Sequence, residues 1–246
     1  MQKASITFLM LVLLFACLSV GQTLGESFER TSGIAPSHAA DLIHSVIEAN
    51  RTIYSEVVVE RLAATISLEA TENWESENTL PLPAQFLALS SSMLKEKGVG
   101  MNYRLISLWP INSNNGPKSI FEKAALQKFF DDPSSAQVST SLDNGKKVFT
   151  AVYPDLAVVQ ACVTCHNNHH KSQKRDFKLG DIMGGIVISF PVSVIEGNSH
   201  AQLISPEVTS DYIHSILESD RTIYSKNIVD RLQNKNIVSA SENWWT

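Results

Sequence analysis

A long internal repeat is the feature that most constrains how this chain of 246 residues can fold. The stretch DLIHSVIEANRTIYSEVVVERL, which begins at Asp41, returns as DYIHSILESDRTIYSKNIVDRL from Asp211. The two copies align without a gap at an offset of 170 residues, and 17 of the 36 positions from Asp41 to Ser76 are identical. Solenoid repeats are only about 20–50 residues long, so a period of this length predicts two tandem copies of a domain.

The repeat divides the chain into a first copy and the beginning of a second one. Ile34 also matches Ile204, so we expect one domain over residues 34–205 and a second copy, reduced to its first helix, over residues 206–246. A piece of 41 residues cannot bury a core by itself. It must dock on the first domain, pair with another chain or remain frayed, and we favour truncation of a tandem protein as its origin.

Residues 1–25 have the composition of an export signal. Lys3 gives a short positive start, the run from Ile6 to Val20 is almost wholly apolar, and Ser19-Val20-Gly21 offers a cleavage site. The apolar run is about 15 residues long, shorter than the roughly 20 that a transmembrane helix needs. We therefore expect a signal peptide and an exported, periplasmic protein. Membrane anchoring by an uncleaved leader, or by lipidation at Cys17, is the alternative.

The hydrophobic pattern of the first copy predicts an α+β fold with an antiparallel sheet. Apolar residues at helical spacing predict a long N-terminal helix and two shorter ones, over residues 37–62, 84–97 and 121–130. Runs rich in β-branched and aromatic residues predict strands over residues 102–109, 147–153 and 185–192. Helices grouped early, with strands spread over the later part, favour α+β architecture.

Residues Cys162-Val163-Thr164-Cys165-His166 form the pattern C-x-x-C-H, the signature by which a c-type haem is attached. Two thiols at this spacing can each form a thioether with a haem vinyl group, and the imidazole that follows can bind the iron as proximal ligand. The one other cysteine, Cys17, lies in the predicted signal peptide. The mature chain would therefore use both of its thiols on one covalent haem c. Such attachment takes place outside the cytoplasm, in agreement with the predicted export.

Three other interpretations of the motif stay open. Zinc could bind Cys162, Cys165 and either His169 or His170, although a second spaced pair for a closed structural site is missing. A redox-active pair would need a thiolate of low pKa, and no thioredoxin-like βαβ pattern surrounds these residues. A plain structural disulfide would suit any exported protein.

Four stretches of the first copy resemble one known family of domains. They are LPLPAQFL, YRLISLWPINSNNGPKSIFEKAAL, FTAVYPDLAVVQACVTCHNNHH and RDFKLGDIMGGIVISFPV. The family comprises single-haem c-type domains with a PAS-like fold, catalogued as a domain of unknown function. Its members are small exported haem proteins or extracytoplasmic input domains of signalling proteins. The resemblance covers residues 41–192 and implies a PAS-like antiparallel sheet, a long leading helix and haem on the C-x-x-C-H residues. Where the family usually has one histidine, this chain has His169-His170, which leaves the haem ligation untouched.

The sixth iron ligand, on the distal side, decides the functional class of a haem protein. The candidate distal ligands are His44, Met93 and Met101, and each can also be an ordinary buried or core-filling residue. Arg51 or Arg175 is a candidate partner for a haem propionate, because a guanidinium binds a carboxylate through two hydrogen bonds. The resemblance does not fix the distal ligand.

We expect a haem protein that transfers electrons or senses redox state or a diatomic gas, with a transient redox partner protein. The formal net charge of −5 gives no reason to expect nucleic acid as a partner. We do not expect an enzyme. The alternatives are a small peroxidase with His44 and Arg51 above the iron, and an interaction module that self-associates through residues 211–245.

Overall fold

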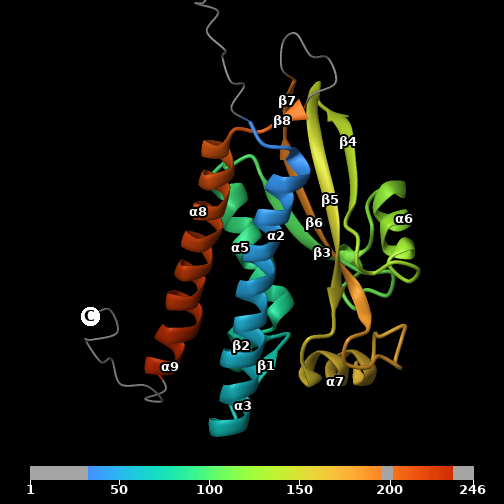
Figure 1. Ribbon diagram of the computed structural model, residues 1–246. Coiled ribbons are helices and arrows are strands. Elements are labelled where there is room, and N and C mark those ends of the chain that lie inside the picture. The colour runs from blue at the N-terminus through green and yellow to red at the C-terminus, as the bar shows by residue number, and fades with distance from the viewer. Residues whose placement is uncertain (1–32, 195–201, 235–246) are drawn as a thin grey trace, which may run out of the picture. The chain divides into compact units, whose positions relative to one another are not determined.

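A four-stranded antiparallel sheet forms the centre of the fold in the computed structural model (Figure 1), which describes residues 33–194 and 202–234. The strand order is β3-β6-β5-β4. These strands span Asn102–Ile106 (β3), Gln137–Asp143 (β4), Lys146–Leu156 (β5) and Ile182–Pro191 (β6). The predicted α+β class with an antiparallel sheet is confirmed. The predicted signal peptide, and the second copy beyond residue 234, lie outside the described residues.

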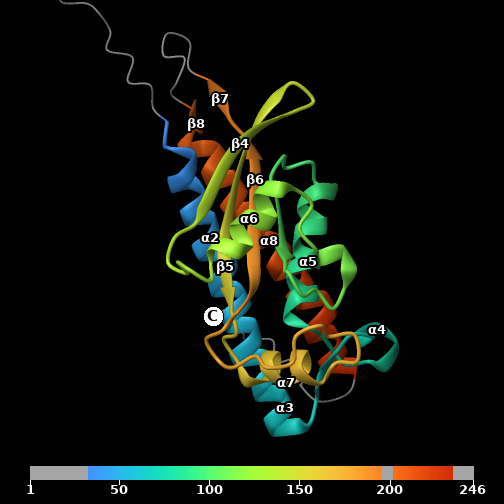
Figure 2. The same ribbon diagram turned by 90° about the vertical axis from the view of Figure 1, so that its right-hand side faces the viewer.

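Helices cover both faces of this sheet (Figures 1 and 2). The long first helix is continuous through α2 (Pro36–Ile53), a π-helical segment η1 (Tyr54–Glu60) and α3 (Arg61–Ile66). It lies on the same face as α5 (Pro83–Glu96) and the second-copy helix, which comprises α8 (Pro206–Ile223), π-helical η3 (Tyr224–Val229) and α9 (Asp230–Asn234). Helix α6 (Ile120–Lys128) lies on the opposite face. None of the described helices is long and apolar enough to span a bilayer.

The shorter elements connect these layers. They are β1 (Ala70–Thr71), α4 (Trp74–Glu77), β2 (Leu80–Pro81), the 3-10 turn η2 (Ser113–Asn115), α7 (Gln160–Asn168), β7 (Ser193–Val194) and β8 (Gln202–Leu203). Proline opens α2, α5 and α8, where its missing N–H costs no hydrogen bond. Strands β4 and β5 are joined by Asn144-Gly145, both with positive φ, as a tight hairpin turn of the I′ kind requires.

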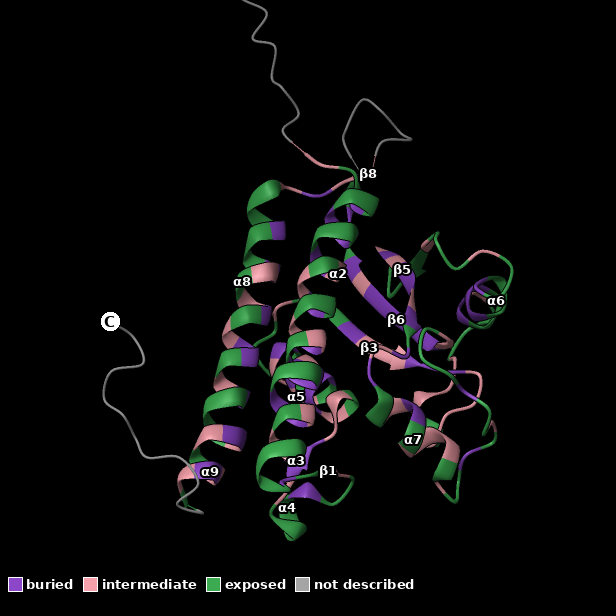
Figure 3. Cartoon of the chain, turned by 60° about the horizontal axis from the view of Figure 1, so that its bottom comes forward, coloured by how far each residue is buried: buried purple, intermediate pink, exposed green. Residues whose placement is uncertain are grey.

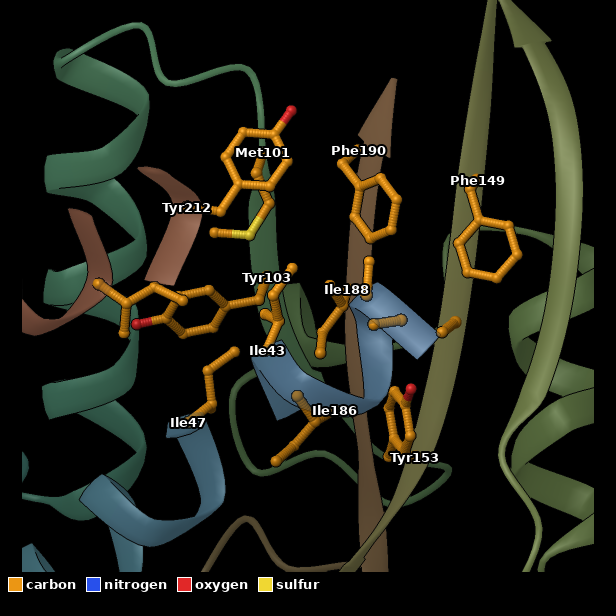
Figure 4. Close-up of a cluster of buried hydrophobic side chains, with 14 of the residues drawn as sticks. Ile43, Ile47, Met101, Tyr103, Phe149, Tyr153, Ile186, Ile188, Phe190 and Tyr212 are labelled. Atoms are coloured by element: carbon orange, nitrogen blue, oxygen red, sulfur yellow. The ribbon is translucent and has the colours of Figure 1, made fainter. Parts of the chain in front are cut away.

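The main core lies between the helical layer and the sheet (Figure 4). Ile43 and Ile47 of α2 meet Ile186 and Ile188 of β6 there, and the second-copy helix adds Tyr212. A second cluster forms lower in the helical layer, and a third lies between the sheet and α6. On α8 the buried residues, purple in Figure 3, lie on the side that faces the rest of the helical layer. The described part of the second copy therefore docks on its own chain.

Candidate functional site

Helix α7 carries the C-x-x-C-H motif at the end of the sheet where β5 stops and β6 starts (Figure 1). Residues three and four apart lie on the same face of a helix. Cys162, Cys165 and His166 therefore project from one face of α7, as attachment of a single group by all three would require. The sheet fixes this helix, because Cys162 N–H donates to the carbonyl of Val159 just after β5, and Ala157 pairs with Asp181 just before β6.

The two thiols are free and half-buried. Burial raises the pKa of Cys162, and Asp155 adds to this rise while Arg51 opposes it. Burial also raises the pKa of Cys165, with a smaller contribution from Glu72. Both groups are therefore protonated thiols at neutral pH. A thiol–disulfide oxidoreductase needs the opposite shift, because its attacking sulfur must be a thiolate.

The two histidines after the motif do not join the thiols in a metal site. His169 Nε2 lies 3.2 Å from a carboxylate oxygen of Glu72, and the ring of His170 lies against that of His169 at a centroid distance of 4.6 Å. Over residues 33–194 and 202–234, no group of three His, Cys, Asp or Glu side chains is placed to hold a metal ion. The zinc interpretation therefore has no support from the geometry.

His166 is a neutral imidazole in a partly apolar setting. Burial lowers its pKa, and the neighbouring His169 lowers it further. Its Nδ1 atom is buried without a hydrogen-bond partner. The edge of the ring meets Phe177 at a centroid distance of 5.8 Å with the planes at 90°. A neutral imidazole is the form that binds metals.

A small apolar cluster surrounds the motif helix. Val163 of α7 packs with Phe177 and Met183, and Cys162 and Trp109 lie against the cluster. Met183, the second residue of β6 within the DIMGG block, belongs to this cluster, and nothing in the sequence pattern marks it as a residue of the site. A flat hydrophobic group held on the thiols of α7 would meet aromatic and thioether surface on this side.

Arg51 and Asp155 form a buried ion pair beside Cys162. Arg51 comes from α2 and Asp155 from the end of β5, and their closest atoms, Nη1 and Oδ1, are 2.6 Å apart. Arg51 Nε and Asp155 Oδ1 nevertheless lack a partner with hydrogen-bond geometry. Burial raises the pKa of Asp155 despite the opposing effect of Arg51. The guanidinium thus retains buried donor capacity close to the motif, as a propionate-binding residue needs.

His44 lies on the same side of α2 as Arg51, two turns earlier. Its ring stacks on Tyr153 with centroids 3.9 Å apart, and the Tyr153 hydroxyl donates to Asp41 at 2.7 Å. Its Nε2 atom is buried without a partner. Burial lowers the pKa of His44, which outweighs the opposite effect of Glu48 and Asp41. His44 is therefore a second neutral imidazole with an unused nitrogen.

The other sequence candidates are placed differently. Met101 is buried in the main core close to Tyr212 (Figure 4), at the start of β3, whereas the motif lies near the other end of that strand. Met93 packs on the second cluster, in the lower part of the helical layer. Arg175 is exposed and donates to the backbone carbonyls of Asn167 and His170. The structure brings Arg51 to the motif, and it leaves the distal ligand a prediction.

Beyond the Arg51–Asp155 ion pair, three buried side-chain nitrogens of α2 and α7 lack a hydrogen-bond partner among the described residues: His44 Nε2, Arg51 Nε and His166 Nδ1. Buried polar groups in folded proteins are normally satisfied, so these atoms have the capacity to bind a further group. The fold and site define an α+β domain that carries a half-buried C-x-x-C-H helix at the end of its sheet.

A scan against family models matches residues 33–191 to the Tll0287-like family. Because the match covers more than half of the chain, the chain belongs to the Tll0287-like family, a domain family of unknown function. No curated protein matches this chain, and no solved structure matches it.

Proposed function

We propose that this chain is an exported, periplasmic c-type haem protein that carries electrons or senses redox state or a diatomic gas. One observation carries the proposal: α7 presents two protonated thiols and a neutral imidazole from one face, and the guanidinium of Arg51, close to Cys162, has a buried Nε without a partner. Family membership supports it, because the match spans the whole motif. The described fold also agrees with the PAS-like sheet and long leading helix that the resemblance implies.

Each residue of the site has a role in this proposal. Cys162 and Cys165 would hold the haem covalently, and His166 would bind its iron. Arg51, kept buried and oriented by Asp155, donates to a propionate. Haem supplies reversible one-electron or gas-binding chemistry when it is bound. Phe177 and Trp109 of the apolar cluster would shield one side of the bound group from water, which tunes the redox potential through the local dielectric.

Among the candidates we take His44 as the distal ligand. It is a half-buried neutral imidazole whose Nε2 is buried without a partner, whereas Met101 packs in the main core away from the motif. For its Nε2 to bind the iron, the ring of His44 would have to leave its stack on Tyr153. Loss of one such ring stack costs about 1 kcal/mol.

The test is maturation of the chain in a host that attaches c-type haem, followed by denaturing electrophoresis with haem staining and by optical spectroscopy. We expect covalent haem in the parent chain, none in the Cys162→Ser/Cys165→Ser double variant, and unchanged attachment in the matched control His170→Ala. Absence of covalent haem from the parent would overturn the proposal.

Carbon monoxide decides between the two functional branches. A reduced spectrum that carbon monoxide does not change indicates six strong ligands and electron transfer. If His44 is the distal ligand, His44→Ala should convert that spectrum to a high-spin form that binds carbon monoxide. A parent spectrum that already responds indicates an open iron and gas sensing, or the peroxidase alternative if hydrogen peroxide is consumed with an electron donor.

A further inference from the structure

The first helices of the two sequence copies lie side by side and run in the same direction (Figure 1). They contact each other at equivalent positions. Ile34 and Ile204 exchange two backbone hydrogen bonds of 2.9 and 3.1 Å, and Asn50 Nδ2 donates to Asp220 Oδ2 at 2.5 Å. In both pairs the partners are 170 residues apart, which is the offset of the repeat. Contact between equivalent residues at two levels of a parallel helix pair is the pattern that a local two-fold axis between the helices produces.

The two helices bury opposite faces. On α8, Tyr212 and Ile223 are 4% and 3% exposed, whereas their equivalents on α2, Leu42 and Ile53, are 41% and 57% exposed. On the core-facing side the order is reversed. Ile47 of α2 is 0% exposed, and its equivalent on α8, Leu217, is 46% exposed. Each helix therefore carries two apolar faces, and each has one of them covered.

The partner of the buried α8 face is known from the structure. Tyr212 and Ile216 join the main core, Ile223 joins the second cluster, and α8 packs more extensively on α5 than on α2. Rotation about the two-fold axis places α8 on α2 and generates a second α5 helix, which packs on the outer face of α2 as α5 packs on α8. The exposed stripe of Leu42 and Ile53 on α2 is thereby positioned to contact the α5 helix of a second copy of the domain.

We propose that α2 is a self-pairing helix whose partner is the α2 helix of a second copy of this chain, and that α8 occupies the partner's position in the monomer. The pairing surface comprises Leu42, Val46, Asn50 and Ile53. In the two-fold dimer, each α2 lies where the other chain's α8 would otherwise be, and each α5 covers the other chain's Leu42 and Ile53. In the monomer, α8 thus blocks the surface of α2 that would otherwise pair with the α2 helix of a second chain.

The residue pair at the axis agrees with this arrangement. In the monomer, Asn50 faces Asp220, a carboxylate that is 7% exposed. In the dimer, Asn50 faces Asn50 of the other chain, and two amides can hydrogen-bond with no buried charge. A single buried asparagine at the interface of parallel helices is a known device for fixing register and the number of strands.

The test uses the full mature chain, with and without attached haem, because the pairing surface is separate from the motif. Ile216→Asp places a charge at a fully buried position of α8 and should release this helix. We expect the parent to be monomeric and Ile216→Asp to be dimeric by light scattering after size exclusion. The milder Ile216→Ala should reach the same dimer at higher protein concentration, which guards against loss of folding in the charged variant.

A second substitution separates specific pairing from sticking of an exposed apolar face. Ile53→Asp alone should leave a folded monomer, since its side chain is exposed. Added to Ile216→Asp or Ile216→Ala, it should restore the monomer. Asn50→Cys should form a disulfide between two chains in the Ile216 variants and not in the parent background. Monomeric Ile216 variants, or a dimer that Ile53→Asp leaves intact, would overturn the proposal. Either result would leave the haem proposal unaffected.

Discussion

Replacement of Arg51 by methionine tests the buried ion pair directly, because methionine keeps an unbranched apolar stem and removes the charged guanidinium. Arg51 and Asp155 are 6% and 8% exposed, so the carboxylate left behind is poorly reached by water. Breaking such a pair from one side costs about 3–5 kcal/mol. For a chain of this length, 1 kcal/mol shifts the melting temperature by about 2–4 °C. We therefore expect a decrease of about 6–20 °C for Arg51→Met.

The second copy supplies a matched control. Arg221 is the repeat equivalent of Arg51, and its side chain is 65% exposed beside Glu218. Surface substitutions usually change stability by less than about 0.5 kcal/mol, so Arg221→Met should melt within about 2 °C of the parent. Addition of Asp155→Asn to Arg51→Met should recover at least half of the loss, because the stranded charge is removed.

Thermal and urea unfolding, followed by circular dichroism, measures these differences. The pKa of Asp155 is raised by burial, and loss of Arg51 raises it further. As the pH falls from 8 to 5, Asp155 takes up a proton in the folded variant before it does so in the unfolded chain, which favours the folded state. The difference in melting temperature between Arg51→Met and the parent should therefore shrink over this range. Equal melting temperatures for Arg51→Met and Arg221→Met would refute the reasoning, as would a deficit that grows on acidification.

Three further predictions concern other parts of the fold. Gly184→Ala would place a Cβ atom 2.1 Å from the carbonyl oxygen of Ile106, so we expect the free energy of unfolding in urea to fall by about 1–3 kcal/mol or more. In the control Gly116→Ala the Cβ atom would lie 3.4 Å from its nearest neighbour, and the free energy of unfolding should be nearly unchanged. Asp220→Asn removes a carboxyl group whose pKa is raised by burial. Because that group is charged at pH 8 and protonated near pH 4, the substitution should stabilise the chain by about 1 kcal/mol at pH 8 and have little effect near pH 4. Melting temperatures measured across this pH range check the expectation. In the haem-free chain, both motif thiols should react with iodoacetamide more slowly than a free cysteine peptide at pH 8, because their pKa values are raised; equal rates would contradict the burial argument.

The sequence predicted those elements whose periodicity is strong. The strands expected over residues 147–153 and 185–192 correspond to β5 and β6, since both carry long apolar runs that are buried between the layers. Strand β4 went unrecognised because it lies at the sheet edge, is largely exposed and has the polar sequence QVSTSLD. The expected first helix is also present, but its π-helical interruption has no signal in a pattern of apolar spacing.

The site was predictable only as far as it is local. Five contiguous residues identify Cys162, Cys165 and His166, whereas Asp155 acquires its importance from Arg51, which is more than a hundred positions away. A hint was available, because an acidic residue at the end of the apolar strand VFTAVYP must find a partner or face solvent. The contact between Met183 and the motif helix likewise depends on how β6 meets α7, which no single segment encodes.

The π-helical turns also set the relative rotation of the two halves of the long first helix. Its upper half packs in the main core, and its lower half packs in the second cluster. Segment η1 occupies residues 54–60 and η3 begins at residue 224, its repeat equivalent; η1 contacts α5, η3 contacts β2, and both contribute to the second cluster. The same wide turn thus recurs at the shared RTIYS sequence of both copies. Each residue of an α-helix turns the chain by about 100°. Deletion of one residue in η1 would therefore rotate α2 by about 100° relative to the lower half of the helix. Arg51 would turn away from Asp155, while the lower half kept its packing in the second cluster.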